Sequence, residues 1–241
     1  MIPLGDDVKG GRLTPVNTLL VAANLGAFAT QVWLDDRASR LVHAFGLVPA
    51  RVVGFLAYPV ADLMPPLTLL TSIFLHAGVL HLAGNMLYLV IFGRAVERRF
   101  GHAPFLCFYL SAGIAAGLAT VWMSPHSTVP VIGASGAIAG VLGAYFVLYP
   151  RARILTLLPV PLALTAVRVP AVVYLLAWFA LQLYAGSSGS RPAMTGSVAW
   201  WAHVGGFLFG VGLAPLVARE SSGRVRKVSR ASSAQTRKAG R

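Results

Sequence analysis

Six apolar stretches, separated by short polar or charged segments, follow one another along the 241-residue chain. Each approaches the length of about 20 residues that a helix needs to cross a bilayer. The pattern therefore predicts an all-α membrane protein, a bundle of six transmembrane helices. The predicted spans are Asn17 to Leu34, Val79 to Val96, Ala103 to Met123, Val131 to Tyr149, Val169 to Ala185 and Val198 to Val217.

The segments around these spans define the predicted domain organisation. Residues 1–16 form a short leader, residues 17–218 the membrane domain and residues 219–241 a basic tail without apolar periodicity, which we expect to be disordered. Residues 35–78 contain four prolines and only short apolar pieces, which is typical of a long first loop that lies in the membrane interface. The proline-interrupted stretch Ile154 to Leu164 is predicted to be a cytoplasmic connector at the membrane.

Composition agrees with a membrane protein. Hydrophobic residues make up 56% of the chain and charged residues 11%, with a mean hydropathy of +0.71. A soluble domain carries roughly twice that share of charge. The net charge of +13 does not indicate nucleic-acid binding, because the basic residues lie between apolar runs and in the tail. Cys107 is the single cysteine, so an intramolecular disulfide is excluded, and we expect it to be a small core residue.

The distribution of basic residues also predicts how the chain is oriented in the membrane. Sixteen of the twenty lie on one side of the predicted topology, and only Arg37, Arg40, Arg51 and Arg191 lie on the other. The richer side is expected to be cytoplasmic, which places both termini there and makes spans two, four and six enter from outside. The tail could bind anionic lipid headgroups or act only as a topology anchor, and the sequence leaves both interpretations open.

Two polar residues in apolar surroundings indicate chemistry. Ser135 lies near the start of the fourth span, and His203 lies near the start of the sixth. Both therefore sit at a depth of about 7 to 10 Å below the outer surface. Because polar groups are unfavourable in lipid, we expect them to face a shared pocket. There the imidazole could accept the serine proton during attack and return it to the leaving amine.

Small residues near these two side chains would let their helices approach closely. Gly136 and Gly140 follow Ser135, and Gly206 and Gly210 follow His203 at positions i+3 and i+7. A serine within a run of small residues is, considered alone, more often a packing residue than a nucleophile.

The site would lack a carboxylate, because all seven acidic residues lie outside the middle of every predicted span. The prediction is therefore a Ser-His dyad whose imidazole is held by packing. The Ser135 N–H, in the first turn of its helix, is a candidate oxyanion donor. His81 and Asn85, spaced i and i+4, could add side-chain donors. An interhelical hydrogen bond is the usual role of such a pair, but the shared depth favours the catalytic interpretation.

A metal site is the alternative chemistry. His76, His81 and His203 could form three zinc ligands, but the chain contains no His-Glu-x-x-His motif and no membrane-embedded carboxylate. We therefore predict no metal and no cofactor.

The same residues resemble the rhomboid family of intramembrane serine proteases. Its motifs match, in chain order, His76 upstream of His81-x-x-x-Asn85, then Glu97-Arg98-Arg99-Phe100-Gly101, Gly133-Ala134-Ser135-Gly136, and Ala202-His203 with Gly206 and Gly210. The resemblance covers residues 66–210. It implies a six-helix core with a short central fourth helix, and it implies Ser135 as nucleophile, His203 as general base and His81, Asn85 and the Ser135 N–H as oxyanion stabilisers.

The resemblance further implies cleavage of single-span membrane substrates near the extracytoplasmic end of their span. We expect an integral protein of a bacterial plasma membrane whose active site opens outward. One departure is Ala139, which replaces an aromatic residue that several members stack on the histidine, so Trp200 or Trp201 could confine the ring instead. A Trp-Arg pair seen in some first loops is also missing. The alternatives are an inactive rhomboid-like protein that binds or escorts membrane clients and, more weakly, a transporter.

Overall fold

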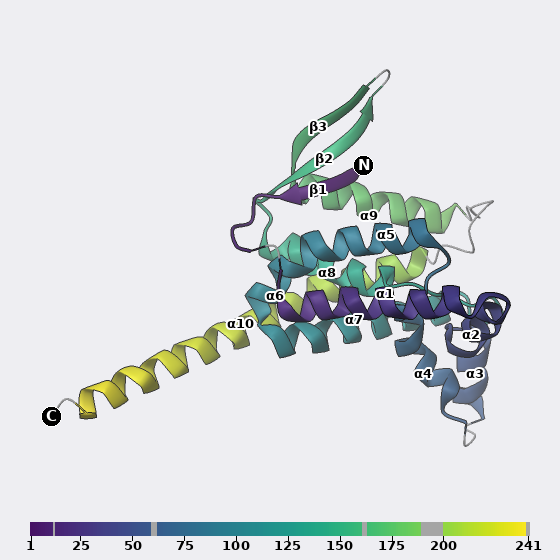
Figure 1. Cartoon of the computed structure of the whole chain (residues 1–241), viewed down its shortest axis with the longest axis horizontal. Helices are drawn as coiled ribbons and strands as arrows, with labels where there is room; N and C mark the ends of the chain where they lie inside the picture. Colours follow the sequence, from purple (N-terminus) through teal and green to yellow (C-terminus); the bar gives the residue numbers. More distant parts are fainter. Residues whose placement is uncertain (12, 59–61, 161–162, 189–199, 240–241) are drawn as a thin grey trace.

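The computed structural model describes residues 1–11, 13–58, 62–160, 163–188 and 200–239. Helices predominate among them, and a small antiparallel sheet projects from one side of the helical bundle (Figure 1). The helices are α1 Pro15–Trp33, α2 Ala38–Phe45, α3 Pro49–Ala57, α4 Met64–Thr71, α5 Val79–Tyr88, α6 Arg94–Phe100, α7 His102–Met123, α8 Ser135–Leu148, α9 Ala171–Ser187 and α10 Trp200–Ala239. Shorter turns are η1 Asp35–Arg37, η2 Ser72–Phe74 and η3 Leu89–Gly93, the last of which links α5 to α6 as a π-helical segment.

Helix α8 forms the centre of the bundle. Its residues 136–145 are all buried, and α7 and α10 pack along it. The aromatic ring of Tyr145 meets that of Phe92 edge to face, with centroids 5.0 Å apart. At 14 residues α8 is shorter than a full membrane crossing. A short central fourth helix of this kind is what the resemblance implies.

Three helices of the described chain are long and apolar enough to cross a membrane: Val79–Phe100, His102–Met123 and Trp200–Ser221. They coincide with the second, third and sixth predicted spans, although residues 198–199 of the sixth lie outside the described residues. The fourth and fifth predicted spans correspond to the shorter apolar helices Ser135–Leu148 and Ala171–Ser187, and the first corresponds to α1. The structure thus supports a mostly helical membrane domain, and the count of six spans stays a prediction.

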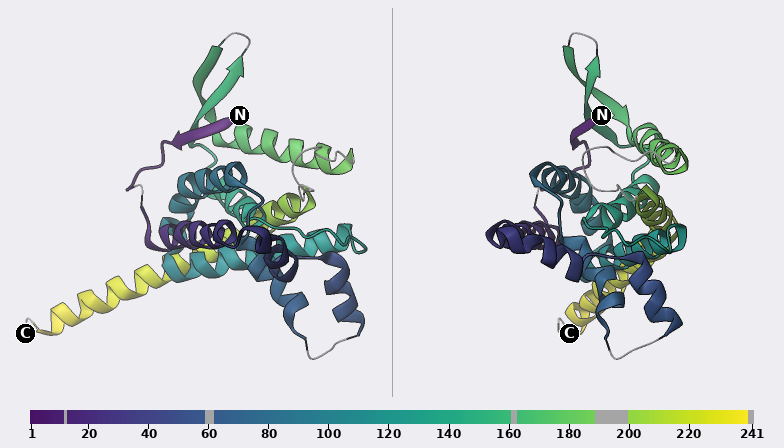
Figure 2. Two further views of the ribbon diagram at one scale, coloured as in Figure 1. Left: turned by 45° about the vertical axis from the view of Figure 1, so that its right-hand side comes forward. Right: turned by 90° about the vertical axis from the view of Figure 1, so that its right-hand side faces the viewer.

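The predicted connector after α8 is a β-hairpin, so the all-α prediction is wrong in this part of the chain. Strands β2 (Arg153–Val160) and β3 (Ala163–Pro170) are antiparallel, and β1 (Ile2–Asp6), from the predicted leader, pairs with the other edge of β2. Figure 2 shows the far end of the β2–β3 hairpin projecting away from the helices, while Ile154 at its base belongs to the core of the bundle. Proline breaks a helix, but the Val, Ile and Thr residues here favour strands. The pairing partner β1 is remote in sequence, so the local pattern did not reveal it.

Two further expectations concern the basic tail and the single cysteine. The backbone of α10 continues as a helix through residues 219–239 (Figure 1), and the disorder expected for this tail stays a prediction. Arg, Lys and Ala, which are compatible with a helix, make up ten of the 21 residues in this stretch, and five others are Ser. Its side chains after Ser221 lie outside the described residues. Cys107, expected in the core, is exposed on α7.

Buried carboxylates attach the N-terminal residues to the bundle. Asp6 accepts a hydrogen bond from the Tyr145 hydroxyl at 2.8 Å and forms an ion pair with Arg94. The Glu97 side chain is fully buried and accepts the backbone N–H groups of Val16 (3.0 Å) and Asn17 (2.7 Å). It therefore caps the first turn of α1, whose N–H groups have no acceptor within the helix.

The predicted interfacial loop contains three short helices, α2, α3 and α4, which lie together at one end of the bundle (Figures 1 and 2). Leu47 and Val131 exchange backbone hydrogen bonds of 3.0 and 2.8 Å. The Gly133 N–H donates to the Ser72 carbonyl oxygen at 2.9 Å. These bonds fix the extended segment that leads into Ser135.

Candidate active site

Ser135 and His203 lie within hydrogen-bond distance, although 68 residues separate them in sequence. The Ser135 Oγ atom is 2.8 Å from Nε2 of His203. Ser135 is the first residue of α8, and His203 lies in the first turn of α10. Two helices that begin at the same level of the bundle therefore bring the hydroxyl and the imidazole together. Their contact was expected from the common depth of the two residues in the sequence.

The small residues make this approach possible. A Cβ atom on Gly206 would collide with the backbone oxygen of Gly136, and a Cβ atom on Gly210 would lie 2.8 Å from the carbonyl carbon of Gly140. Any side chain at these positions would push α10 away from α8. The predicted pairs of glycines thus face one another directly.

A residue that the sequence reasoning missed contacts the other ring nitrogen. The Oε1 atom of Gln182, on α9, lies 2.7 Å from Nδ1 of His203. An amide oxygen only accepts hydrogen bonds, so Nδ1 carries the proton and Nε2 of the neutral ring is left as the acceptor. The Ser135 hydroxyl then donates to Nε2. The signal was present in the sequence, because Gln182 is a polar residue inside an apolar span.

Two tryptophan rings confine the imidazole. The Trp178 ring of α9 lies 5.9 Å from the His203 ring at an interplanar angle of 40°, and the Trp200 ring lies 6.2 Å away, edge to face. Of the two substitutes suggested for the missing aromatic, Trp200 contacts the ring. Ala139 is fully buried, and a Cβ atom on Gly206 would lie 3.3 Å from its Cβ. The tight contact between α8 and α10 thus leaves little room for a larger residue there.

His81 and Asn85 face the residues just before Ser135. A Cβ atom on Gly133 would lie 2.9 Å from Nε2 of His81 and 3.8 Å from Nδ2 of Asn85. The Ala77 N–H donates to Nδ1 of His81 at 3.3 Å, so the neutral ring carries its proton on Nε2, the side that faces Gly133. The Asn85 Nδ2 atom is buried and has no partner within the described chain.

Backbone donors lie at the same place. Ile138 donates to the Ala134 oxygen at 2.9 Å, so the N–H groups of Ser135, Gly136 and Ala137 precede the first internal hydrogen bond of α8. The N-terminal end of α8, with its free backbone N–H groups, therefore lies beside the serine. The side-chain N–H groups of His81 and Asn85 lie near the same place. Such an arrangement favours a developing negative charge.

His76, the upstream histidine, supports this arrangement without touching Ser135 or His203. This residue is 2% exposed, and its ring lies 5.2 Å from the His81 ring, edge to face. Gln31 of α1 holds its backbone at two points, accepting from the N–H at 2.9 Å and donating to the oxygen at 3.1 Å. Within the described residues, no group of three or more His, Cys, Asp or Glu side chains is arranged to hold a metal ion.

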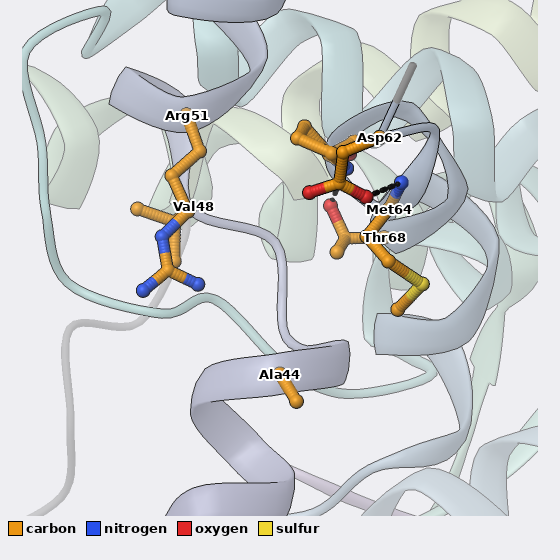
Figure 3. Close-up of a pocket in the computed structure, with 7 residues that line it drawn as sticks. Ala44, Val48, Arg51, Asp62, Met64 and Thr68 are labelled. Carbon is orange, nitrogen blue, oxygen red and sulfur yellow. Dashed lines mark hydrogen bonds between the residues drawn. The ribbon is translucent and has the colours of Figure 1, made fainter. Parts of the chain in front are cut away.

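A separate pocket of about 150 Å³ lies among α2, α3 and α4 (Figure 3). Arg51 and Asp62 contribute its charged groups, and neither Ser135 nor His203 lines it. The Arg51 guanidinium donates to the His43 carbonyl oxygen at 2.6 Å, and the Asp62 carboxylate accepts the Met64 N–H at 2.9 Å (Figure 3 shows the second bond). The pocket is therefore not part of the Ser135 and His203 site.

Comparison with known proteins gives a consistent result. The family model described as "Rhomboid domain" matches residues 66–220. The Rhomboid protease GluP of Bacillus subtilis is 53% identical over 76 residues, 32% of this chain and 14% of that protein. Rhomboid protein 1, mitochondrial, of Saccharomyces cerevisiae is 32% identical over 151 residues, 60% of this chain and 40% of that protein. Inactive rhomboid protein 1 of Drosophila melanogaster is 29% identical over 123 residues, 51% of this chain and 8% of that protein. The chain thus aligns with less than half the length of each of these relatives.

Proposed function

This chain belongs to the rhomboid family of membrane proteins, and from that premise we propose that it is a serine peptidase that hydrolyses peptide bonds of other membrane proteins. The observation that carries the proposal is the 2.8 Å hydrogen bond between Ser135 Oγ and His203 Nε2. The bacterial relative that is 53% identical over its aligned part is named as a protease.

In the proposed reaction, Ser135 Oγ attacks the carbonyl carbon of the scissile bond while its proton passes to Nε2 of His203. The carbonyl oxygen becomes an oxyanion, which accepts hydrogen bonds from the Ser135 N–H and from the side chains of His81 and Asn85. His203 then gives its proton to the leaving amine, and an acyl-enzyme is formed. A water molecule, deprotonated by His203 in turn, hydrolyses this ester and restores the serine.

The surroundings of the site suggest the class of substrate. Ser135 and His203 lie at helix starts within an apolar bundle, so a peptide has to reach them from a membrane environment. We propose a single-span membrane protein, cut near the extracytoplasmic end of its span, with both termini of the enzyme in the cytoplasm. The basic tail would then face anionic lipid headgroups.

The proposal is tested by replacing each member of the pair. Ser135→Ala and His203→Ala should each lower the rate of cleavage of a single-span substrate in proteoliposomes by at least about 10³-fold. Ser187→Ala and His126→Ala, which alter exposed residues of the same types, should leave the rate unchanged. Undiminished cleavage by either site variant would rule out the dyad.

A second candidate is an inactive rhomboid-like protein that binds membrane clients. This candidate is supported by Inactive rhomboid protein 1 of Drosophila melanogaster, which aligns with 51% of this chain. A fluorophosphonate probe separates the two functions, because a peptidase forms a covalent adduct that Ser135→Ala abolishes. A protein that only binds clients gives no adduct that depends on Ser135.

A further inference from the structure

Gln182 is the polar residue of the site that the proposed dyad does not use. It lies on α9, is 7% exposed and directs its amide oxygen at Nδ1 of His203 over 2.7 Å. A buried polar group in an apolar helix is unfavourable unless it is hydrogen-bonded. The contact with His203 provides such a partner.

We infer that Gln182 is a positioning residue, which holds His203 in the tautomer and ring orientation that let Nε2 accept the serine proton. This inference rests on the proposed peptidase function. If Nδ1 lost its acceptor, the proton could move to Nε2, and the imidazole would then present a donor to Ser135 Oγ. A ring in that state cannot act as a base toward the serine.

An amide suits this position better than a carboxylate. Its oxygen dipole stabilises the imidazolium that forms during attack, yet it places no permanent negative charge in an apolar surrounding. Gln182 therefore orients His203, as the third residue of a catalytic triad would, without placing an anion inside the bundle.

The position of Gln182 is fixed by its own helix. Trp178, one turn earlier on the same face of α9, lies against the imidazole, and the neighbouring Phe179 ring stacks on Phe207 of α10 with centroids 4.7 Å apart. These contacts hold α9 against α10. Nucleophile, base and orienting amide thus come from three different helices, α8, α10 and α9.

Side chains from three helices contact the His203 ring. It faces Ser135 from α8, Gln182 and Trp178 from α9, and Trp200 from its own helix. The titratable side chain nearest to this site on α5 is His81, which lies beside Gly133. Substitution of Gln182 alone leaves all of these groups in place except the acceptor at Nδ1, so a resulting change in the pH profile is attributable to that contact.

The first test compares Gln182→Leu and Gln182→Glu with the exposed control Tyr184→Phe. Gln182→Leu removes the acceptor at similar volume and should lower kcat by about 10- to 100-fold while KM stays within about twofold. Gln182→Glu keeps an acceptor and should restore most of kcat. Its carboxylate should also move the acidic limb of the kcat profile upward by about one pH unit, because it favours the imidazolium.

The second test reads the ring directly. In protein labelled with ¹⁵N-histidine, the nitrogen resonances of His203 should report a proton on Nδ1 in the wild type and a mixture of tautomers in Gln182→Leu. The inference is overturned if Gln182→Leu keeps the wild-type kcat and pH profile, or if the tautomer is the same in both proteins. If the wild type itself cleaves nothing, the peptidase proposal fails, and the resonances alone still decide whether Gln182 sets the tautomer.

Discussion

Gly133 has a backbone conformation that side-chain-bearing residues rarely adopt, with φ at +127°. Its N–H is held by the Ser72 oxygen, and a Cβ atom there would lie 2.8 Å from Cε1 of His81. This one residue therefore sets both the direction in which the chain enters α8 and the space that the His81 ring occupies. Gly133 is thus required by backbone geometry and by the shape of the proposed oxyanion site.

Gly133→Ala should impair the site more than the fold. We expect a backbone strain of about 1 to 3 kcal/mol and a displaced His81 ring, with a fall in kcat of about tenfold or more. Cleavage assays and thermal unfolding in detergent would measure the two effects. Gly78→Ala is the matched control, because Gly78 is extended at φ 166° and has open space around its Cβ position. Equal activity of the two variants would contradict this role for Gly133.

At the scale of elements, the contact between α8 and α10 depends on backbone approaching backbone. Gly206 lies against Gly136 and Gly210 against Gly140, so at these two points the helix backbones meet without a side chain between them. The hydrogen bond between Ser135 and His203 spans this same contact. A change in helix separation anywhere along it is therefore transmitted to the distance between Oγ and Nε2.

Gly210→Ala should force the two helices apart and lower the free energy of unfolding by about 1 to 3 kcal/mol. Gly212→Ala, two residues along the same helix, meets nothing within 4 Å and should be neutral or stabilising by about 0.5 kcal/mol. Reversible unfolding of the purified protein in mixed micelles would measure the difference. If the variants had equal stability, the close contact between the helices would not contribute to folding.

At the scale of the whole molecule, the three-stranded sheet joins remote parts of the chain. Ile2 pairs with Leu157, and Asp6 pairs with Ile154 before its carboxylate reaches Tyr145 and Arg94. The N-terminal residues are thus tied both to the hairpin between α8 and α9 and to the bundle itself.

This pairing can be tested by cross-linking in a Cys107→Ser background. Ile2→Cys with Leu157→Cys should form an intramolecular disulfide on mild oxidation, because paired residues of antiparallel strands have Cα atoms about 4.5 to 5.5 Å apart. Ile2→Cys with Ala166→Cys should not, since Ala166 lies on β3, one strand further away. Thiol labelling with a mass tag would count the free cysteines. A cross-link in the second pair, or none in the first, would refute the register.

The sequence predicted those features that depend on local pattern. Apolar stretches located the long helices, and the shared depth of Ser135 and His203 indicated their contact. What it missed depends on partners that are distant in sequence: the strands β1 to β3, the capping of α1 by Glu97 and the hydrogen bond of Gln182 to His203. Gln182 was visible as a polar residue in an apolar span, but only the packing of α9 on α10 reveals which nitrogen it contacts.

The place of β1 in the sheet also bears on how the protein is made. Its partner residues in β2 emerge from the ribosome about 150 residues later, which at about 5 to 20 residues per second is a delay of roughly eight to thirty seconds. Until then residues 2–6 have no strand to join, and Asp6 has no Tyr145 to bind. The attachment of these first residues is therefore among the late steps of biogenesis, after most of the helices have been synthesised.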